Sequence, residues 1–222
     1  MEGVDLGYVR IGLFQFLLTL GSLVLHGWIR AWTAERLGDP TPRATGRVTL
    51  NPLAHLDLIG TVVMPLFCLF GLNGLVIGWA KPVLTTPVAF RRPRAYDILS
   101  LLAGPGLHFL IAAAAVVVGV QLVRPGRPDE LFGPLAAINA GLGITCLLPV
   151  PPLPGGEILR RVVNMSDATF ARISRWSGLI LMLALNFEIV VRGMLRFVAV
   201  AYWPYLQLCR ALKPAAVPLL FG

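Results

Sequence analysis

The chain has 222 residues, of which 56% are hydrophobic and only 14% are charged, and its formal net charge is +8. Soluble domains carry about 25% charged residues, so this composition excludes an ordinary soluble domain and predicts a single membrane domain over residues 1–222. The basic residues lie between apolar stretches rather than in one patch, which indicates loops beside an anionic lipid bilayer and argues against a nucleic-acid partner.

The first apolar stretch, residues 11–34, has no formal charge between Arg10 and Arg30. It exceeds the roughly 20 residues that a transmembrane helix needs. Glu2 and Asp5 precede it in place of a basic segment, and no small-residue cleavage site follows it. These features predict a retained membrane helix rather than a signal peptide.

A polar segment follows at residues 38–56 and contains Arg47-Val48-Thr49-Leu50-Asn51-Pro52. Valine and threonine favour strands, and an Asn-Pro pair is typical of a turn. The segment therefore predicts a short β-hairpin directly after the first helix.

Three further apolar stretches occupy the middle of the chain, at residues 58–80, 98–123 and 131–156. Glycines interrupt the first of them, so that helix is expected to bend or to end early. The third ends in prolines, which cannot continue a helix, and its helix should stop near Leu148. A basic, proline-containing loop at residues 81–94 separates the first two.

The last third of the chain is less regular. Residues 176–191 are apolar except for Glu188, and Arg192 follows at a spacing of four. This predicts a fifth membrane helix and then a segment that lies at the interface or crosses again. The expected fold is thus an all-α bundle of five or six transmembrane helices, with a core at 11–159 and C-terminal helices at 170–213. Basic residues on both sides leave the orientation open.

Six motifs in chain order resemble those of the site-2 protease family of intramembrane zinc metalloproteases. The resemblance covers about residues 17–159 and implies a bacterial cell-membrane protein. The segments that carry it are His26-Gly27-Trp28-Ile29-Arg30, Leu37-Gly38-Asp39-Pro40, residues 46–57, Gly78-Trp79-Ala80-Lys81-Pro82-Val83, Ala103-Gly104-Pro105, and residues 148–156.

The resemblance implies a zinc site, and the chain departs from it at most positions. The family uses two histidines of an HExxH motif as zinc ligands, the glutamate between them as general base, and a distant aspartate as third ligand. His26 keeps the first ligand. Gly27 stands at the base, Arg30 at the second histidine and Pro154 at the aspartate, and none of these three can perform the inherited role.

Two interpretations of the altered site remain open. Arg30 and Glu157 could form an ion pair that replaces the metal between the first and fourth helices, although Arg30 could instead extend toward the interface. Alternatively, His108 and Cys146, which stand where the family often has asparagines, could join His26 in a new metal site, or simply pack inside the bundle.

The sequence therefore predicts a non-catalytic relative of these proteases, without a cofactor, that binds another membrane protein or a substrate helix without cleaving it. The predicted hairpin would add a strand to an extended partner through Arg47, Val48, Thr49, Leu50 and Asn51. The alternative is an active protease with zinc in an unusual site. A transporter is disfavoured because intramembrane acids are scarce.

Overall fold

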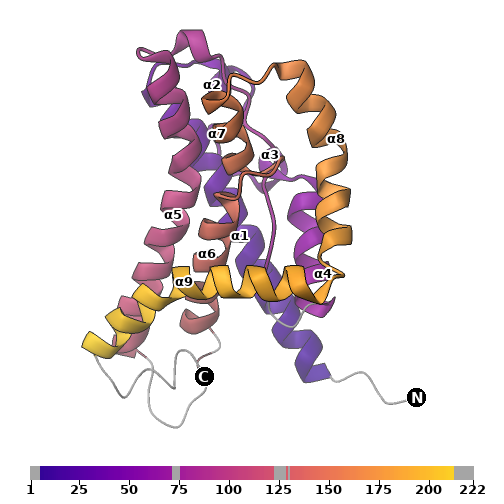
Figure 1. Cartoon of the computed structure of the whole chain (residues 1–222). Coiled ribbons are helices and arrows are strands. Elements are labelled where there is room, and N and C mark those ends of the chain that lie inside the picture. The colour runs from indigo at the N-terminus through magenta and orange to yellow at the C-terminus, as the bar shows by residue number, and fades with distance from the viewer. Residues whose placement is uncertain (1–5, 72–75, 123–128, 130, 213–222) are drawn as a thin grey trace.

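The computed structural model describes residues 6–71, 76–122, 129 and 131–212. Every regular element within these residues is a helix, as the class prediction stated (Figure 1). The elements are α1 (Leu6–Arg36), α2 (Thr41–Ala44), α3 (Pro52–His55), η1 (Leu58–Val63), α4 (Met64–Gly71), η2 (Pro87–Ala89), α5 (Pro93–Leu122), α6 (Phe132–Cys146), α7 (Pro154–Val162), α8 (Asp167–Ala184) and α9 (Glu188–Leu212).

Helix α1 turns several polar residues inward and leaves several large apolar residues exposed. Ser22, His26 and Arg30 are among its buried residues, whereas Leu13 and Leu17 are exposed. A soluble protein would bury those leucines, but lipid solvates them as well as a protein core would. The polar functional residues of α1 therefore face the interior of the bundle.

The predicted β-hairpin after the first helix is wrong, because no strand occurs in the part of the chain that the structure describes. Asn51 caps helix α3 instead: its side chain accepts a hydrogen bond from the backbone N–H of Leu53, and Pro52 occupies the first helical position. Asparagine at the cap followed by proline is also a helix-start signal. The Thr49 carbonyl is bonded to His55 Nε2 at 2.7 Å, so it is not available to a partner strand.

The second apolar stretch enters the bundle as η1 and α4 and does not continue across. Beyond α4 the backbone returns beside the segments that precede it. The N–H of Trp79 donates to the Gly60 carbonyl at 3.0 Å and that of Lys81 to the His55 carbonyl at 2.9 Å. Further along, Arg91 donates to Leu37 at 3.2 Å. Both loops that flank the stretch therefore lie at the same end of the molecule.

Helices α5 and α6 form the centre of the bundle. Their contact is built from small side chains, Ala112, Ala115, Ala136 and Ala140, which are all buried and allow the backbones to approach closely. Helix α6 ends at Cys146, two residues before the predicted end, and the proline-rich segment that follows leads into α7.

The C-terminal helices differ in direction. Helix α8 runs alongside the bundle, while α9 lies across its lower end (Figure 1). Tyr205 anchors α9 by donating to the Phe109 carbonyl at 3.0 Å, and Arg192, Arg196 and Trp203 are exposed on its outer side. Arginine and tryptophan on the outer side of a transverse helix are typical of the membrane interface.

Three described helices, α1, α5 and α9, are long and apolar enough to cross a membrane, and the apolar helices at 58–71 and 132–146 are shorter. This falls short of five or six full-length spans. Residues 72–75, 123 and 213, which belong to predicted helices, lie outside the described residues.

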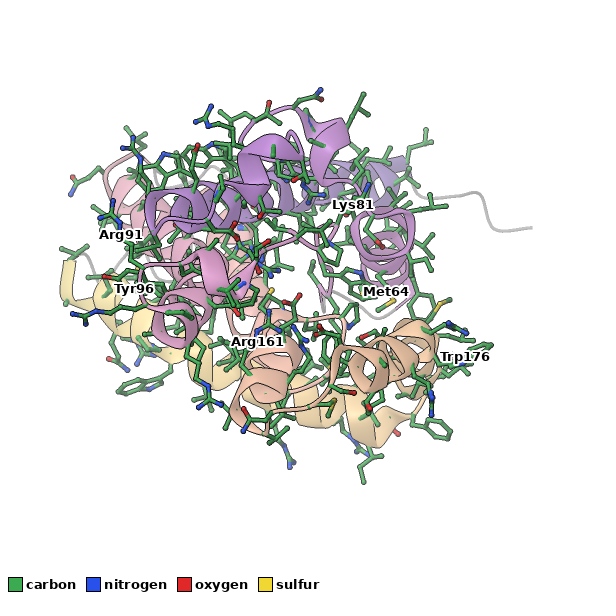
Figure 2. The ribbon with its side chains drawn as sticks, turned by 90° about the horizontal axis from the view of Figure 1, so that it is seen from above. Met64, Lys81, Arg91, Tyr96, Arg161 and Trp176 are labelled. Carbon is green, nitrogen blue, oxygen red and sulfur yellow. The ribbon has the colours of Figure 1, made fainter. Side chains whose placement is uncertain are left out.

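Seen from above, Arg161 points toward the middle of the molecule while Trp176 points outward (Figure 2).

Candidate functional site

The altered HExxH segment lies in the upper half of α1. His26, Gly27 and Arg30 are all on its buried face, as expected for positions i, i+1 and i+4 of one helix. His26 is 5% exposed and Arg30 is 4% exposed. Arg30 thus stays inside the protein and does not reach the interface.

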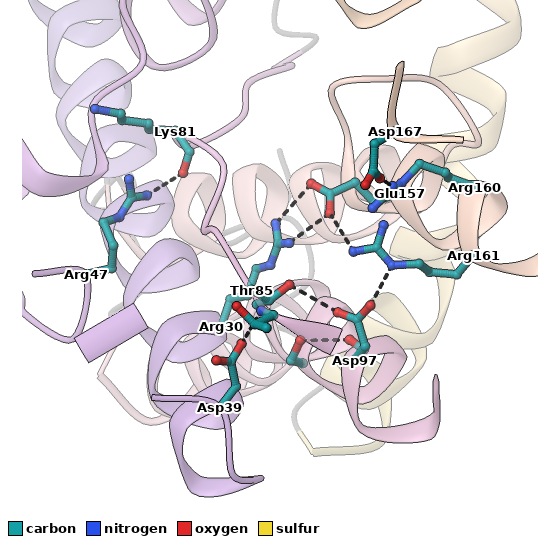
Figure 3. Close-up of polar contacts among 12 residues, drawn as sticks. Arg30, Asp39, Arg47, Lys81, Thr85, Asp97, Glu157, Arg160, Arg161 and Asp167 are labelled. Carbon is teal, nitrogen blue, oxygen red and sulfur yellow. Dashed lines mark hydrogen bonds and ion pairs between the residues drawn. The ribbon is translucent and has the colours of Figure 1, made fainter. Parts of the chain in front are cut away.

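The Arg30 guanidinium meets the Glu157 carboxylate from α7. Nη2 lies 2.9 Å from Oε2 and Nη1 lies 3.3 Å from Oε1, so the pair is bidentate (Figure 3). The two side chains are 5% and 12% exposed. Parallel N–H donors of arginine fit a carboxylate in this geometry. The contact connects α1 to α7 across the altered site.

The ion pair belongs to a larger network of alternating charges. Arg161 Nη2 lies 3.9 Å from Glu157 Oε2, and Arg161 Nε donates to Asp97 of α5 at 2.5 Å (Figure 3). The hydroxyl of Thr85 donates to the other oxygen of Asp97 at 3.3 Å. Two arginines and two carboxylates thus balance one another, which is what burial of charge requires.

Two glycines set the position of Glu157. A Cβ atom on Gly155 would lie 2.3 Å from the Leu147 carbonyl oxygen, and one on Gly156 would lie 2.6 Å from the backbone of Val150. Only glycine permits this approach of α7 to the proline-rich segment. Glu157 then falls in the first turn of α7, where the helix dipole favours a carboxylate.

The position of the general base is filled by another residue. A Cβ atom on Gly27 would lie 2.4 Å from Nδ1 of His55, so the imidazole ring occupies the space that a glutamate side chain would need. His55 is fully buried. Burial lowers the pKa of His55. The hydrogen bond with the Thr49 carbonyl raises this pKa, and the positive charge of Arg47 lowers it further. The signal in the sequence was the glycine at the base position, which leaves space for a neighbouring side chain.

The segment predicted to bind a partner through Arg47–Asn51 is tied to the protein. Arg47 is 7% exposed, and its Nη2 donates to the Lys81 carbonyl at 2.5 Å (Figure 3). Burial, and then the charge of Arg30, lowers the pKa of Arg47. The hairpin on which the predicted strand addition depended is absent from the described residues, and the Arg47 side chain and the Thr49 carbonyl already have partners within the chain.

Three side chains of types that can ligate a metal also lie close together in the bundle. His26 from α1, His108 from α5 and Cys146 from α6 place one ligating atom each within 4.8 Å of one another, and all three residues are buried. The two imidazole rings lie 5.1 Å apart between centroids. Sequence reasoning named these three residues as an alternative, and the fold does bring them together.

The retained family position, His26, and the three altered ones line one small cavity. His26, Gly27, Arg30 and Pro154 surround a volume of about 10 Å³, roughly the space of one water molecule. A zinc ion has four ligands in tetrahedral sites, and here the guanidinium and the proline ring offer no lone pair. The inherited ligand set therefore does not fit zinc, since His26 is its one remaining ligand.

Comparisons with known proteins agree with the motifs. YwhC of Bacillus subtilis (strain 168) is 30% identical over 167 residues, which cover 70% of this chain and 73% of that protein. Rip2 of Mycolicibacterium smegmatis is 27% identical over 89% of this chain and 75% of its own length. The protein sll0528 of Synechocystis is 32% identical over 28% of this chain and 16% of its own length. All three carry provisional names as zinc metalloproteases.

No family model and no solved structure matches the chain. The similarity to YwhC, together with the apolar helices, identifies a multi-pass integral membrane protein. The chain belongs to the site-2 protease family of intramembrane zinc metalloproteases.

Proposed function

We propose that this protein is a non-catalytic member of its family, which binds a segment of another membrane protein without cleaving it. One observation carries the proposal: the position of the second zinc-binding histidine holds Arg30, whose guanidinium is engaged by Glu157 at 2.9 Å. A guanidinium at this position supplies no lone pair and so cannot act as the second ligand.

The glutamate that serves the family as general base is absent as well. Hydrolysis at zinc requires a group that takes a proton from the attacking water. Gly27 has no such group, and His55 occupies the space in which one would lie. Glu157 is the acid nearest to Arg30, but its two oxygens accept from Arg30 and one also faces Arg161. Both carboxylate oxygens are therefore already engaged by guanidinium groups.

A groove between α1, α6 and α9 supports the binding half of the proposal. Its volume is about 310 Å³, and it opens on a surface that already has apolar residues exposed. An apolar helix of a partner would fit such a lining, which is formed by Gln15, Val76, Pro134, Ala137, Ile138, Gly141, Leu195, Val198, Ala199 and Tyr202.

The experiment reconstitutes the purified protein in liposomes with a panel of single-span membrane proteins. We expect no cleavage product by mass spectrometry, and crosslinking from a photoreactive residue at Ala199 but not at Leu110, which is exposed on α5 outside the groove. Cleavage that is lost in His26→Ala would contradict the proposal. Equal crosslinking from both positions would contradict the assignment of the groove.

A further inference from the structure

The cluster of His26, His108 and Cys146 is separate from the inherited ligand set and shares only His26 with it. Its members come from three different helices, and their ligating atoms lie within 4.8 Å of one another. His108 and Cys146 are 0% exposed. Buried polar atoms normally have a hydrogen-bond partner, so their partners indicate which atoms remain free for a ligand.

The hydrogen bonds around His108 fix its proton. The amide nitrogen of Asn139 donates to Ser22 Oγ at 3.0 Å and to the Leu135 carbonyl at 2.9 Å. The amide oxygen must therefore face His108, and it lies 2.8 Å from Nδ1. Nδ1 carries the proton, and Nε2 presents a bare lone pair. Nε2 is buried without a hydrogen-bond partner in the described chain. In metal sites, a hydrogen bond from the second ring nitrogen orients the ligating histidine in the same way.

His26 is held just as firmly by packing. A Cβ atom on Gly104 would lie 2.3 Å from the His26 ring, so α5 presents a bare backbone surface to the imidazole. His26 Nδ1 is buried and also has no hydrogen-bond partner among the described residues. Two neighbouring histidines thus each leave a ring nitrogen unpaired inside the bundle.

Cys146 completes the set as the last residue of α6. Its thiol is free and buried. Two imidazoles and one thiolate are ligands that zinc accepts, whereas hard ions such as Mg²⁺ and Ca²⁺ prefer oxygen ligands.

We propose that His26, His108 and Cys146 bind one Zn²⁺ ion, which joins α1, α5 and α6. When the ion binds, the Cys146 S–H bond breaks, the sulfur electron pair forms the bond to zinc, and the proton leaves to solvent. The site provides a link between helices. It goes beyond the proposed function and holds whether or not the protein cleaves a substrate.

The test uses the full-length protein in detergent, loaded with Zn²⁺ and dialysed to remove loosely bound metal. We expect about one zinc per chain by elemental analysis. Replacement by Co²⁺ should give a thiolate-to-cobalt absorption band. Cys146→Ser should lose this band, while Cys68→Ser and Cys209→Ser, which replace the other two buried thiols, should keep it.

A second variant tests the orientation of His108. Asn139→Ala removes the acceptor of the Nδ1 proton and should weaken Co²⁺ binding by about 10- to 100-fold. The fully buried His55, which lies outside the cluster, serves as the matched histidine control, and His55→Gln should keep the band.

Zinc-free wild-type protein after loading would overturn the site, as would a band that persists in Cys146→Ser. The wild-type measurement does not depend on the folding of any variant. Bound zinc together with substrate cleavage would support the site and overturn the non-catalytic function, so the two proposals fail separately.

Discussion

Arg30 and Glu157 are separated by 127 positions in the sequence, yet their side chains meet through two N–O contacts of 2.9 and 3.3 Å. The contact joins α1 to α7, the two elements that contribute the zinc ligands in the family pattern. A buried salt bridge thus connects these two elements.

Glu157→Gln should destabilise the protein by on the order of 3 kcal/mol, because it leaves a buried guanidinium without a charged partner. Arg30→Met should cost less, since Glu157 still faces Arg161 at 3.9 Å. Thermal unfolding in detergent measures both effects. The double variant should show a coupling of about 1–3 kcal/mol.

Glu188→Gln is the matched control for this pair. Glu188 and Arg192 also form a salt bridge, at 3.5 Å, but their side chains are 77% and 63% exposed. Loss of this exposed salt bridge should change the free energy of unfolding by less than about 0.5 kcal/mol. Equal effects of Glu157→Gln and Glu188→Gln would show that the buried pair has no special role.

Gly27→Ala should destabilise the protein by about 1–3 kcal/mol, because the new methyl group overlaps the buried ring of His55. Gly21→Ala in the same helix meets no atom within 4 Å and should be neutral or stabilising by up to about 1 kcal/mol. Thermal unfolding compares them. The interpretation fails if His55→Ala does not relieve the cost of Gly27→Ala.

Gly104→Ala should displace His26, since the added Cβ would lie 2.3 Å from its ring. We expect a loss of stability of about 1–3 kcal/mol and weaker Co²⁺ binding in the absorption titration. Gly106→Ala lies in the same helix with nothing within 4 Å and should leave both unchanged. Unchanged Co²⁺ binding in Gly104→Ala would mean that the His26 ring is not held by α5.

Thr45→Cys and Arg92→Cys should react with an impermeant maleimide from the same side of the membrane, because the chain between them enters the bundle and returns. Both positions are exposed, and the native thiols are buried. Asn186→Cys, at the junction of α8 and α9, should react from the opposite side (Figure 1). Labelling of Thr45→Cys and Arg92→Cys from opposite sides would mean that residues 58–71 cross.

Local sequence signals were sufficient for features that depend on a single helix, such as its apolar character and its end. The apolar stretches predicted the membrane class, and the prolines after Cys146 predicted the end of α6. The same local signals misled at Asn51-Pro52, which initiates α3 rather than a turn between strands. A three-residue strand preference is weak, and buried contacts of Arg47 and His55 outweigh it.

The residue types alone indicate that His26 can ligate a metal and that Gly27, Arg30 and Pro154 offer neither a general base nor a ligand, because these are properties of single side chains. Helical periodicity also placed His26 and Arg30 on one face. Periodicity does not say which distant residue meets that face. The folded chain is needed to see that Arg30 meets Glu157, that His55 fills the space beside Gly27, and that His108 and Cys146 approach His26. Such contacts depend on how separate helices pack.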